Sequence, residues 1–157
     1  MIIVNVEVKM AKQDDWNEAI LLAKHTFCTC NYKDCTLEGA KHFLMGLENP
    51  RLYQAFLQGY YLMIGAYVQQ QLVGMITIRN DNHISLFFVK PSIQEQGVGL
   101  LLLQAAIRYC QGKGHNIVCV NASRLAVPFY EKNGFYTIQQ EYLDDGVYIT
   151  PMRCELA

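Results

Sequence analysis

Six residues, Gln94-Glu-Gln-Gly-Val-Gly99, lie where the chain passes from one apolar pattern to another. The preceding run, residues 83–89, is short and aromatic, as expected of a buried strand, whereas residues 98–112 are rich in strong helix formers. A glycine-containing turn that leaves a strand and opens a helix presents unpaired backbone N–H groups in one direction, backed by the positive end of the helix dipole. The pattern therefore predicts an anion site, most naturally for phosphate.

The hexapeptide alone leaves a second interpretation open, because its glycines could serve only the geometry of a tight turn. It is not a dinucleotide fingerprint, which needs a third glycine and an acidic residue about 20 positions further on. It is not a P-loop either, since no Gly-Lys-Ser/Thr follows. The turn contains no Lys or Arg, and Lys90 lies upstream. Any anion is thus expected to be held by amides rather than by ion pairs.

Length and composition narrow the function classes. With 157 residues, 52% of them hydrophobic and 17% charged, the chain is expected to form a single domain over residues 1–157. A net charge of −1 argues against nucleic acid or an anionic membrane surface as the partner. No apolar run reaches the roughly 18–20 residues of a membrane span, and the N-terminus has no basic segment of a signal peptide. We expect a cytoplasmic protein.

Six cysteines raise the question of a metal site. His25, Cys28, Cys30 and Cys35 lie close together, but the spacing C-x-C-x4-C is not a C-x2-C pair and no second pair follows. Reduced thiols are the simpler interpretation, so we expect no metal. A zinc-binding interaction module built on these residues stays as an alternative that metal analysis would test.

The apolar periodicity and the turn residues predict the elements that position the glycine turn. We expect strands at 2–9, 60–68, 72–79, 83–89, 116–120, 135–141 and 147–154, and helices from Asp14-Asp15 onward and at 36–47, 98–112 and 124–132. The stretch 51–59 is either a loop or a further short helix. The three strands before the turn should run antiparallel. The strand at 116–120 should run parallel to 83–89, because a helix separates the two.

A second motif, Asn121-Ala-Ser-Arg-Leu-Ala-Val-Pro-Phe-Tyr-Glu-Lys-Asn-Gly-Phe135, completes a recognisable set with Val89-x-Pro91 and Gln94-x-x-Gly97-x-Gly99. Together they resemble the GCN5-related N-acetyltransferase (GNAT) superfamily, in the family's order and spacing. The resemblance is strong over about residues 60–140, and residues 1–60 match only in layout. It implies an α/β (α+β) fold with a mixed, mostly antiparallel sheet of about seven strands flanked by about four helices.

The resemblance also implies acetyl-coenzyme A as cosubstrate. Its pantetheine arm is expected to pair with main-chain groups of Phe87, Phe88 and Val89, at an edge freed by two strands that splay apart. Asn121 is a further candidate for the arm, although Arg124 stands where some relatives carry an asparagine. The residues expected to hold the pyrophosphate through their amides are Gln94, Glu95, Gln96, Gly97, Val98 and Gly99.

Tyr130 is the candidate for chemistry, within the family's Phe/Leu-Tyr-x-x-x-Gly-Phe segment. A phenol with a pKa near 10 can donate a proton to a departing thiolate, whose conjugate acid has a pKa of about 8.5. The base that frees the amine is not evident. Some relatives carry a glutamate where this chain has Cys119, and the strand before the glycine turn offers only His83 and Ser85. We therefore name His83 as the candidate base, directly or through water.

The expected function is acetyl transfer from acetyl-coenzyme A to a primary amine of a small molecule, peptide or protein, by direct transfer in a ternary complex. The alternative is a catalytically weak acetyl-coenzyme A sensor or regulatory module. Acceptor choice is expected to come from residues 25–60 and the 142–147 loop, and a homodimer is left open. The acidic residues Glu141, Asp144 and Asp145 either line the acceptor mouth or belong to a solvated loop. Four tyrosines either form an aromatic acceptor pocket or cover the sheet: they are Tyr32, Tyr53, Tyr60 and Tyr61.

Overall fold

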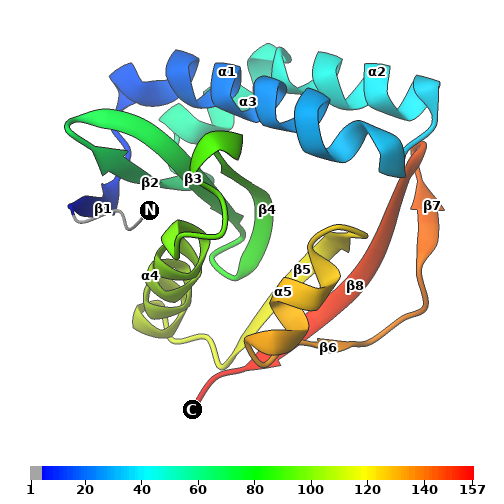
Figure 1. Cartoon of the computed structure of the whole chain (residues 1–157). Helices are drawn as coiled ribbons and strands as arrows, with labels where there is room; N and C mark the ends of the chain where they lie inside the picture. The colour runs from blue at the N-terminus through cyan, green and yellow to red at the C-terminus, as the bar shows by residue number, and fades with distance from the viewer. Residues whose placement is uncertain (1–4) are drawn as a thin grey trace.

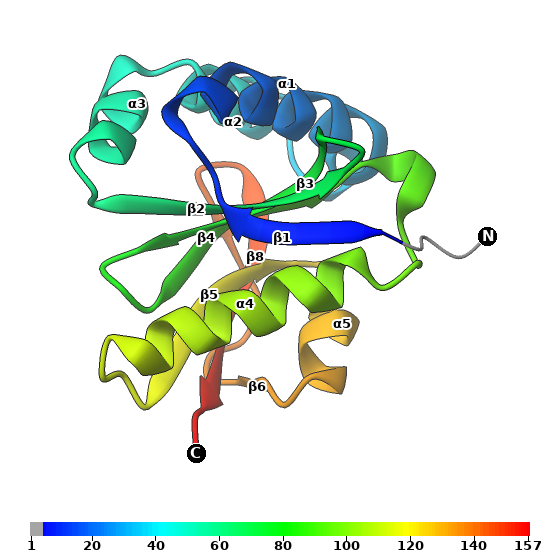
Figure 2. The same ribbon diagram turned by 90° about the vertical axis from the view of Figure 1, so that its left-hand side faces the viewer.

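The computed structural model describes residues 5–157, which form an eight-stranded sheet between two layers of helices. Helices α1 to α3 cover one face and α4 and α5 the other (Figures 1 and 2). Seven strands follow the order β1-β2-β3-β4-β5-β8-β6, and β7 pairs with β8 outside that path. The strands are β1 (Val6–Met10), β2 (Tyr61–Val68), β3 (Gln71–Arg79), β4 (His83–Val89), β5 (Ile117–Ser123), β6 (Tyr136–Thr137), β7 (Tyr142–Asp144) and β8 (Val147–Glu155).

The helices follow the apolar periodicity of the sequence. They are α1 (Trp16–Thr26), α2 (Leu37–Leu47), α3 (Pro50–Leu57), α4 (Val98–Gly112) and α5 (Val127–Lys132). Thr36 caps α2 by accepting a hydrogen bond from the Gly39 N–H, and Asn49 caps α3 with Pro50 in the first turn. The stretch 51–59, which the sequence leaves as loop or helix, is mostly helical because α3 extends to Leu57. Within residues 5–157 no helix has the length and apolar character needed to cross a membrane.

The mixed, mostly antiparallel sheet is confirmed, with eight strands and five α-helices rather than about seven and four. β4 and β5 run parallel, as the intervening helix requires. The strand expected at 135–141 is wrong in extent: only Tyr136–Thr137 pair there, and Tyr142–Asp144 form a separate strand that hairpins onto β8. Part of the first expected strand, residues 2–4, lies outside the described residues.

Two apolar clusters hold the layers together, one on each face of the sheet. The cluster beneath α4 and α5 contains Ile76, Leu102, Val118 and Met152, whereas Trp16 belongs to the cluster beneath α1 to α3. A β-bulge in β4 decides which residues enter which cluster, because Ile76 pairs with Phe87 but Ile78 pairs with Ile84. Ile84 therefore packs on the α4 side, while Leu86 and Phe88 pack on the α1 side.

Candidate active site

The sheet opens between β4 and β5. The two strands pair only at His83 with Cys119 and at Ile84 with Val120, and then diverge, as Figure 1 shows. The opening begins at the bulge, where the Leu86 N–H turns inward and donates to the Thr77 hydroxyl at 2.8 Å. A bulge bends its strand and increases the local twist. The edge of β4 that faces β5 is consequently left without a partner strand from residue 85 to residue 89.

The start of α4 lies at the end of this open edge. Gly97 precedes the helix with a φ of 88°, and the first intrahelical bond runs from the Leu101 N–H to the Gly97 carbonyl at 3.1 Å. The amides of the first turn before Leu101 thus have no intrahelical acceptor. A Cβ added at Gly97 would meet no atom within 4 Å, so the space beside this residue at the start of the helix is open. Gln94 ties the turn to β4 by donating to the Val89 carbonyl at 2.9 Å.

An open edge of strand beside a helix start with free amides fits the chemistry of acetyl-coenzyme A. The arm of that molecule carries amide groups, which can pair with strand edge groups. Its pyrophosphate is an anion of the kind that helix N-termini bind. Whether Phe87 to Val89, Gln94 to Gly99 and Asn121 bind it stays a prediction.

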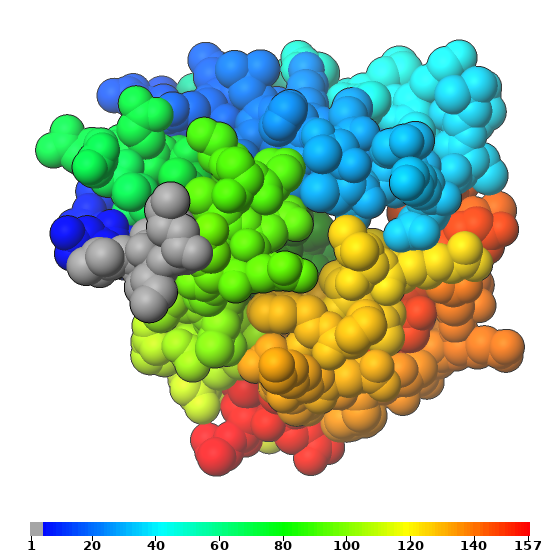
Figure 3. Space-filling view, viewed as in Figure 1, coloured from blue at the N-terminus to red at the C-terminus, as the bar shows by residue number. Residues whose placement is uncertain are grey.

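A cavity of about 320 Å³ lies in the opening between β4 and β5, and Figure 3 shows a recess between the green, blue and yellow segments that form this region. It reaches from Tyr130 on α5 across both strands to the start of α2. The residues that line it are Phe27, Asn31, Asp34, Gly39, His42, Phe43, Ile84, Ser85, Leu86, Phe87, Phe88, Val120, Asn121, Ala122, Ser123, Ala126, Tyr130, Asp144, Asp145, Val147 and Ile149.

Tyr130 lines this cavity and is otherwise enclosed, with 2% of its surface exposed. Its ring packs against Phe135, Phe129 and Phe87, with ring centroids 5.0, 5.6 and 6.3 Å away. Burial raises the pKa of the phenol above its ordinary value of 10.0. The hydroxyl therefore stays protonated across the physiological range and is available as a proton donor.

His83 lies at the closed end of the opening, paired with Cys119, and does not line the cavity. Burial, assisted by the charge of Arg79, lowers its pKa to about 4. Its role as base, directly or through water, stays a prediction. Ser85, two residues further along β4, does line the cavity, and its hydroxyl accepts a hydrogen bond from Tyr61.

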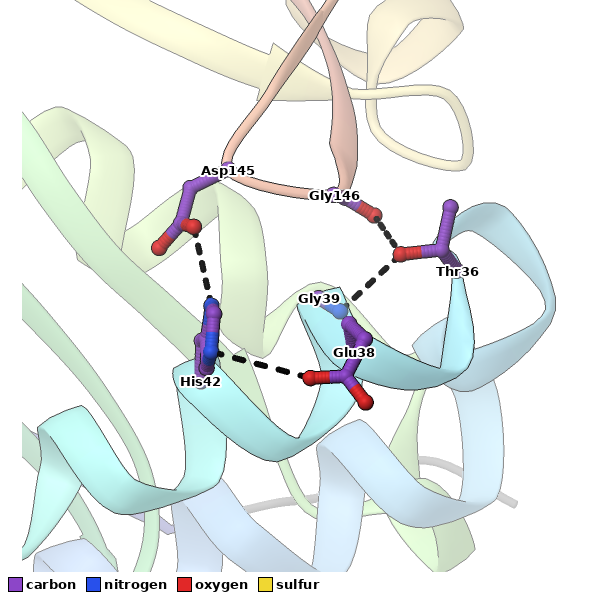
Figure 4. A network of polar contacts seen from close by, with 6 residues as sticks. All are labelled: Thr36, Glu38, Gly39, His42, Asp145 and Gly146. Atoms are coloured by element: carbon purple, nitrogen blue, oxygen red, sulfur yellow. Dashed lines mark hydrogen bonds and ion pairs between the residues drawn. The ribbon is translucent and has the colours of Figure 1, made fainter.

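The far side of the cavity is formed by two segments distant in sequence. One follows α1, where a π-helical turn (Phe27–Asn31) and a 3-10 turn (Tyr32–Asp34) bring Asn31 and Asp34 to the cavity. The other is the β7–β8 turn, residues Asp145 and Gly146. The Thr36 N–H donates to the Gly146 carbonyl at 2.8 Å, and Figure 4 shows this turn seated on the start of α2.

The β7–β8 turn also brings a carboxylate to a histidine. The Nδ1 atom of His42 lies 2.9 Å from Oδ1 of Asp145, and its Nε2 atom lies 3.9 Å from Oε2 of Glu38 (Figure 4). His42 and Asp145 both line the cavity, whereas Glu38 does not. Sequence reasoning missed His42, because it lies on an amphipathic helix with no motif around it and its partner is 103 residues away.

Several residues expected at the acceptor mouth lie elsewhere. Glu141 accepts two hydrogen bonds of 2.8 Å from Arg124, which lower its pKa, and it does not line the cavity. Asp144 and Asp145 do line it. None of the four tyrosines considered for an aromatic acceptor pocket lines the cavity: they are Tyr32, Tyr53, Tyr60 and Tyr61. Phe27 and Phe43, stacked at 4.4 Å, line it instead.

The cysteine cluster after α1 does not assemble a metal site within residues 5–157. No three His, Cys, Asp or Glu side chains of these residues lie close enough to hold a metal ion together. Cys35 contacts the carbonyls of Tyr32 and Asn31, and Cys30 lies 3.7 Å from Gln94.

Comparison with known proteins supports one family. An acetyltransferase (GNAT) domain model matches residues 31–156. Over 79 residues the chain is 34% identical to an uncharacterized N-acetyltransferase YafP of Escherichia coli, a match covering 50% of this chain and 49% of that protein. Over 98 residues it is 29% identical to the peptidyl-lysine N-acetyltransferase YjaB of Salmonella typhimurium, covering 62% and 66%. The chain thus spans about half to two thirds of these relatives' lengths.

Solved structures show the same fold over the whole chain. A GCN5-related N-acetyltransferase from Rhodopseudomonas palustris superposes with a TM-score of 0.88 at 21% identity and covers 99% of both chains. The PaiA N-acetyltransferase from Thermoplasma acidophilum, solved in complex with coenzyme A, gives a TM-score of 0.83 at 18% identity and covers 97% of this chain and 99% of that one. With the family model spanning most of its length, the chain belongs to the GNAT acetyltransferase family.

Proposed function

We propose that this protein transfers the acetyl group of acetyl-coenzyme A to a primary amine by direct transfer in a ternary complex. The observation that carries the proposal is the cavity between β4 and β5. It places an unpaired strand edge and the buried Tyr130 on one side and a group of acidic side chains on the other. A thioester is already activated, so no covalent enzyme intermediate is needed once the two substrates lie side by side.

The donor side is assigned to β4 and α4. The open edge from Phe87 to Val89 pairs with the arm, Asn121 contacts it from β5, and the amides from Gln94 to Gly99 hold the pyrophosphate. The coenzyme A complex of PaiA, which has this fold, supports such a molecule as ligand. The thioester then lies in the opening, within reach of Tyr130. That phenol protonates the sulfur as the carbon–sulfur bond breaks.

The acceptor side selects for positive charge. Three carboxylates line the cavity, those of Asp34, Asp144 and Asp145, and no lysine or arginine of residues 5–157 lines it. An alkylammonium ion is attracted into such a site, whereas an acceptor with its own carboxylate is repelled. Acceptors with a second positive charge are therefore preferred. The peptidyl-lysine N-acetyltransferase among the relatives is consistent with an amine acceptor.

The test is a screen of amines with free-thiol release as the signal. Polyamines, lysine peptides, amino acids, aminoglycosides and peptide N-termini are each incubated with enzyme and acetyl-coenzyme A. Cationic amines should release thiol in stoichiometry with acetylated product. Tight binding of acetyl-coenzyme A without thiol release from any amine would instead establish the sensor alternative.

Replacing Tyr130 by Phe tests the proton donor. Turnover at saturating substrates should fall by about 10²-fold or more, with little change in coenzyme affinity, because general acid catalysis contributes about 10²–10⁴-fold. Tyr136→Phe is the matched control, since that phenol lies on β6 and donates to Glu155 outside the cavity. Equal turnover of both variants would remove Tyr130 from the mechanism.

A further inference from the structure

Attack on a thioester requires a neutral amine, and the cavity holds one histidine that can produce it. A lysine-like amine, with a pKa of about 10.4, is neutral about once in 2,500 molecules at pH 7, equivalent to roughly 4.6 kcal/mol. His83 lies outside the cavity lining, at the closed end of the opening. His42 lines the cavity together with the acidic side chains of Asp34, Asp144 and Asp145.

The position of His42 is fixed by the way α2 begins. The Thr36 hydroxyl caps the helix by accepting a hydrogen bond from the Gly39 N–H at 3.0 Å. The N–H of Thr36 donates to the Gly146 carbonyl. Gly39 and Gly146 approach so closely that a Cβ on Gly146 would lie 2.5 Å from the Gly39 Cα. This contact brings Asp145 one helical turn along α2, where its carboxylate meets His42 (Figure 4).

The hydrogen bond to Asp145 decides which nitrogen of His42 carries the proton in the neutral ring. A carboxylate only accepts hydrogen bonds, so Nδ1 must be the donor and Nε2 carries the lone pair. Nε2 lies 3.9 Å from Glu38, beyond hydrogen-bond distance, and has no other partner in residues 5–157. The side chain is 50% exposed, which gives a proton a path to solvent.

The surroundings of His42 are acidic. Asp145 and Glu38 face its two nitrogens, and Asp34 and Asp144 share the cavity. Among residues 5–157, Tyr130 is the other titratable side chain in the lining, and no lysine or arginine lines the cavity. An alkylammonium ion is therefore attracted to the part of the cavity that contains His42.

We propose that His42 is the general base of the acetyl transfer and that Asp145 is the residue that positions it, an inference that rests on the proposed function. The bound alkylammonium gives one N–H proton to Nε2 of His42, and the amine lone pair then forms the C–N bond. The C–S bond breaks with its electron pair on sulfur, which takes the phenol proton of Tyr130. A second N–H proton, lost as the amide forms, reprotonates Tyr130 through solvent. His42 releases its own proton to solvent.

The experiment compares acceptors of different pKa. His42→Ala should lower kcat by about 10²–10³-fold for an alkylamine with a pKa near 10.4. The loss should be below about tenfold for an α-amine with a pKa near 8, which is already neutral about one time in ten. Added imidazole should restore part of the alkylamine turnover. The acid limb of the wild-type pH profile of kcat/KM should be lost.

Two further variants separate a base from a residue that only holds the turn. His42→Gln keeps an amide donor for Asp145 but has no base, so it should be as defective as His42→Ala. Asp145→Asn should lower kcat about tenfold for the alkylamine and less for the α-amine, because the imidazole loses the carboxylate that fixes its tautomer and orientation. His25→Gln, on the exposed side of α1, is the control and should behave as wild type.

The outcomes distinguish this proposal from the proposed function. Recovery of wild-type turnover by His42→Gln, or an equal loss for both classes of amine, would show that His42 is structural and overturn its role as base. A wild-type protein that binds acetyl-coenzyme A but acetylates no amine would overturn the proposed function and this inference with it. Coenzyme-induced thermal stabilisation of each variant confirms that it folds.

Discussion

Gly97→Ala should weaken coenzyme A binding, and the structure gives the reason in two parts. The first is conformational, because Gly97 has a φ of 88°, in the left-handed region. A residue with a Cβ costs roughly 1–2 kcal/mol there. No protein atom lies within 4 Å of the added Cβ, so no clash adds to that cost. For a chain of this size the melting temperature should fall by about 2–8 °C.

The second part concerns the ligand. A Cβ at Gly97 would enter open space at the start of α4, and the pyrophosphate is proposed to lie against the free amides of that helix start. Displacing the phosphate from one amide forfeits a hydrogen bond to a charged group, about 1.5–3 kcal/mol. The dissociation constant of coenzyme A should therefore rise by roughly 10–100-fold, beyond any change that the loss of stability explains.

Calorimetry with coenzyme A and thermal unfolding measure both parts. Gly112→Ala is the matched control, since this glycine lies at the opposite end of α4 and its Cβ would meet no atom within 4 Å. It should bind coenzyme A within about threefold of wild type. Lys90→Ala should also change affinity little, because Lys90 lies outside the turn. Wild-type affinity in Gly97→Ala, or a larger loss in Lys90→Ala, would refute an amide-based phosphate site.

Three further predictions concern stability and acceptor choice. In the wild type, lowering the pH from about 6.5 to 4 should reduce the free energy of unfolding, because the His83 ring takes up a proton in the unfolded chain at a higher pH than in the folded one. His83→Gln should remove this part of the pH dependence, which the partly exposed ring limits to about 1–2 kcal/mol. Urea unfolding at both ends of that pH range measures the effect. Gly39→Ala should lower the free energy of unfolding by about 1–3 kcal/mol, because its Cβ would lie 2.6 Å from the Gly146 Cα. Gly46→Ala on the same helix is the control: its Cβ would meet no atom within 4 Å, so a thermal melt should show unchanged or higher stability. The double variant Asp34→Asn/Asp144→Asn should raise KM for a diamine by about 5–25-fold, since each lost charge pair costs about 1 kcal/mol. KM for a monoamine should rise less. Equal changes for the two amines would contradict charge selection.

The elements that form the proposed donor side could be predicted from sequence because they are contiguous. The glycine turn, the strand before it and the helix after it are neighbours along the chain, so local pattern and spacing place them together. The parallel pairing of β4 and β5 follows from the intervening helix and is confirmed. The bulge opposite Thr77 has no sequence pattern of its own, since Ile84, Leu86 and Phe88 alternate as in a regular strand.

On the other side of the cavity, the sequence indicates Asp144 and Asp145 but not Asp34 and His42, which lie far from them along the chain. Asp34 follows a π-helical turn, and His42 lies on the polar side of α2. Both residues lie near the β7–β8 turn because the sheet order places β8 beside β5. The position of a residue along the chain does not indicate such long-range neighbours. The four tyrosines suggest a pocket only by their residue type. In the structure, the Tyr53 ring packs against Trp16 and the Tyr61 hydroxyl donates to Ser85.

The bulge in β4 has a consequence for the ligand-free protein. An unpaired strand edge is ordinarily a place where another chain adds a strand and aggregation begins. Here the edge from residue 85 to residue 89 borders the cavity between β4 and β5. The backbone amides of this edge that point toward β5 have no strand partner. They should exchange hydrogen for deuterium quickly in the free protein and slowly with coenzyme A bound, so that the ligand takes the place of the missing strand.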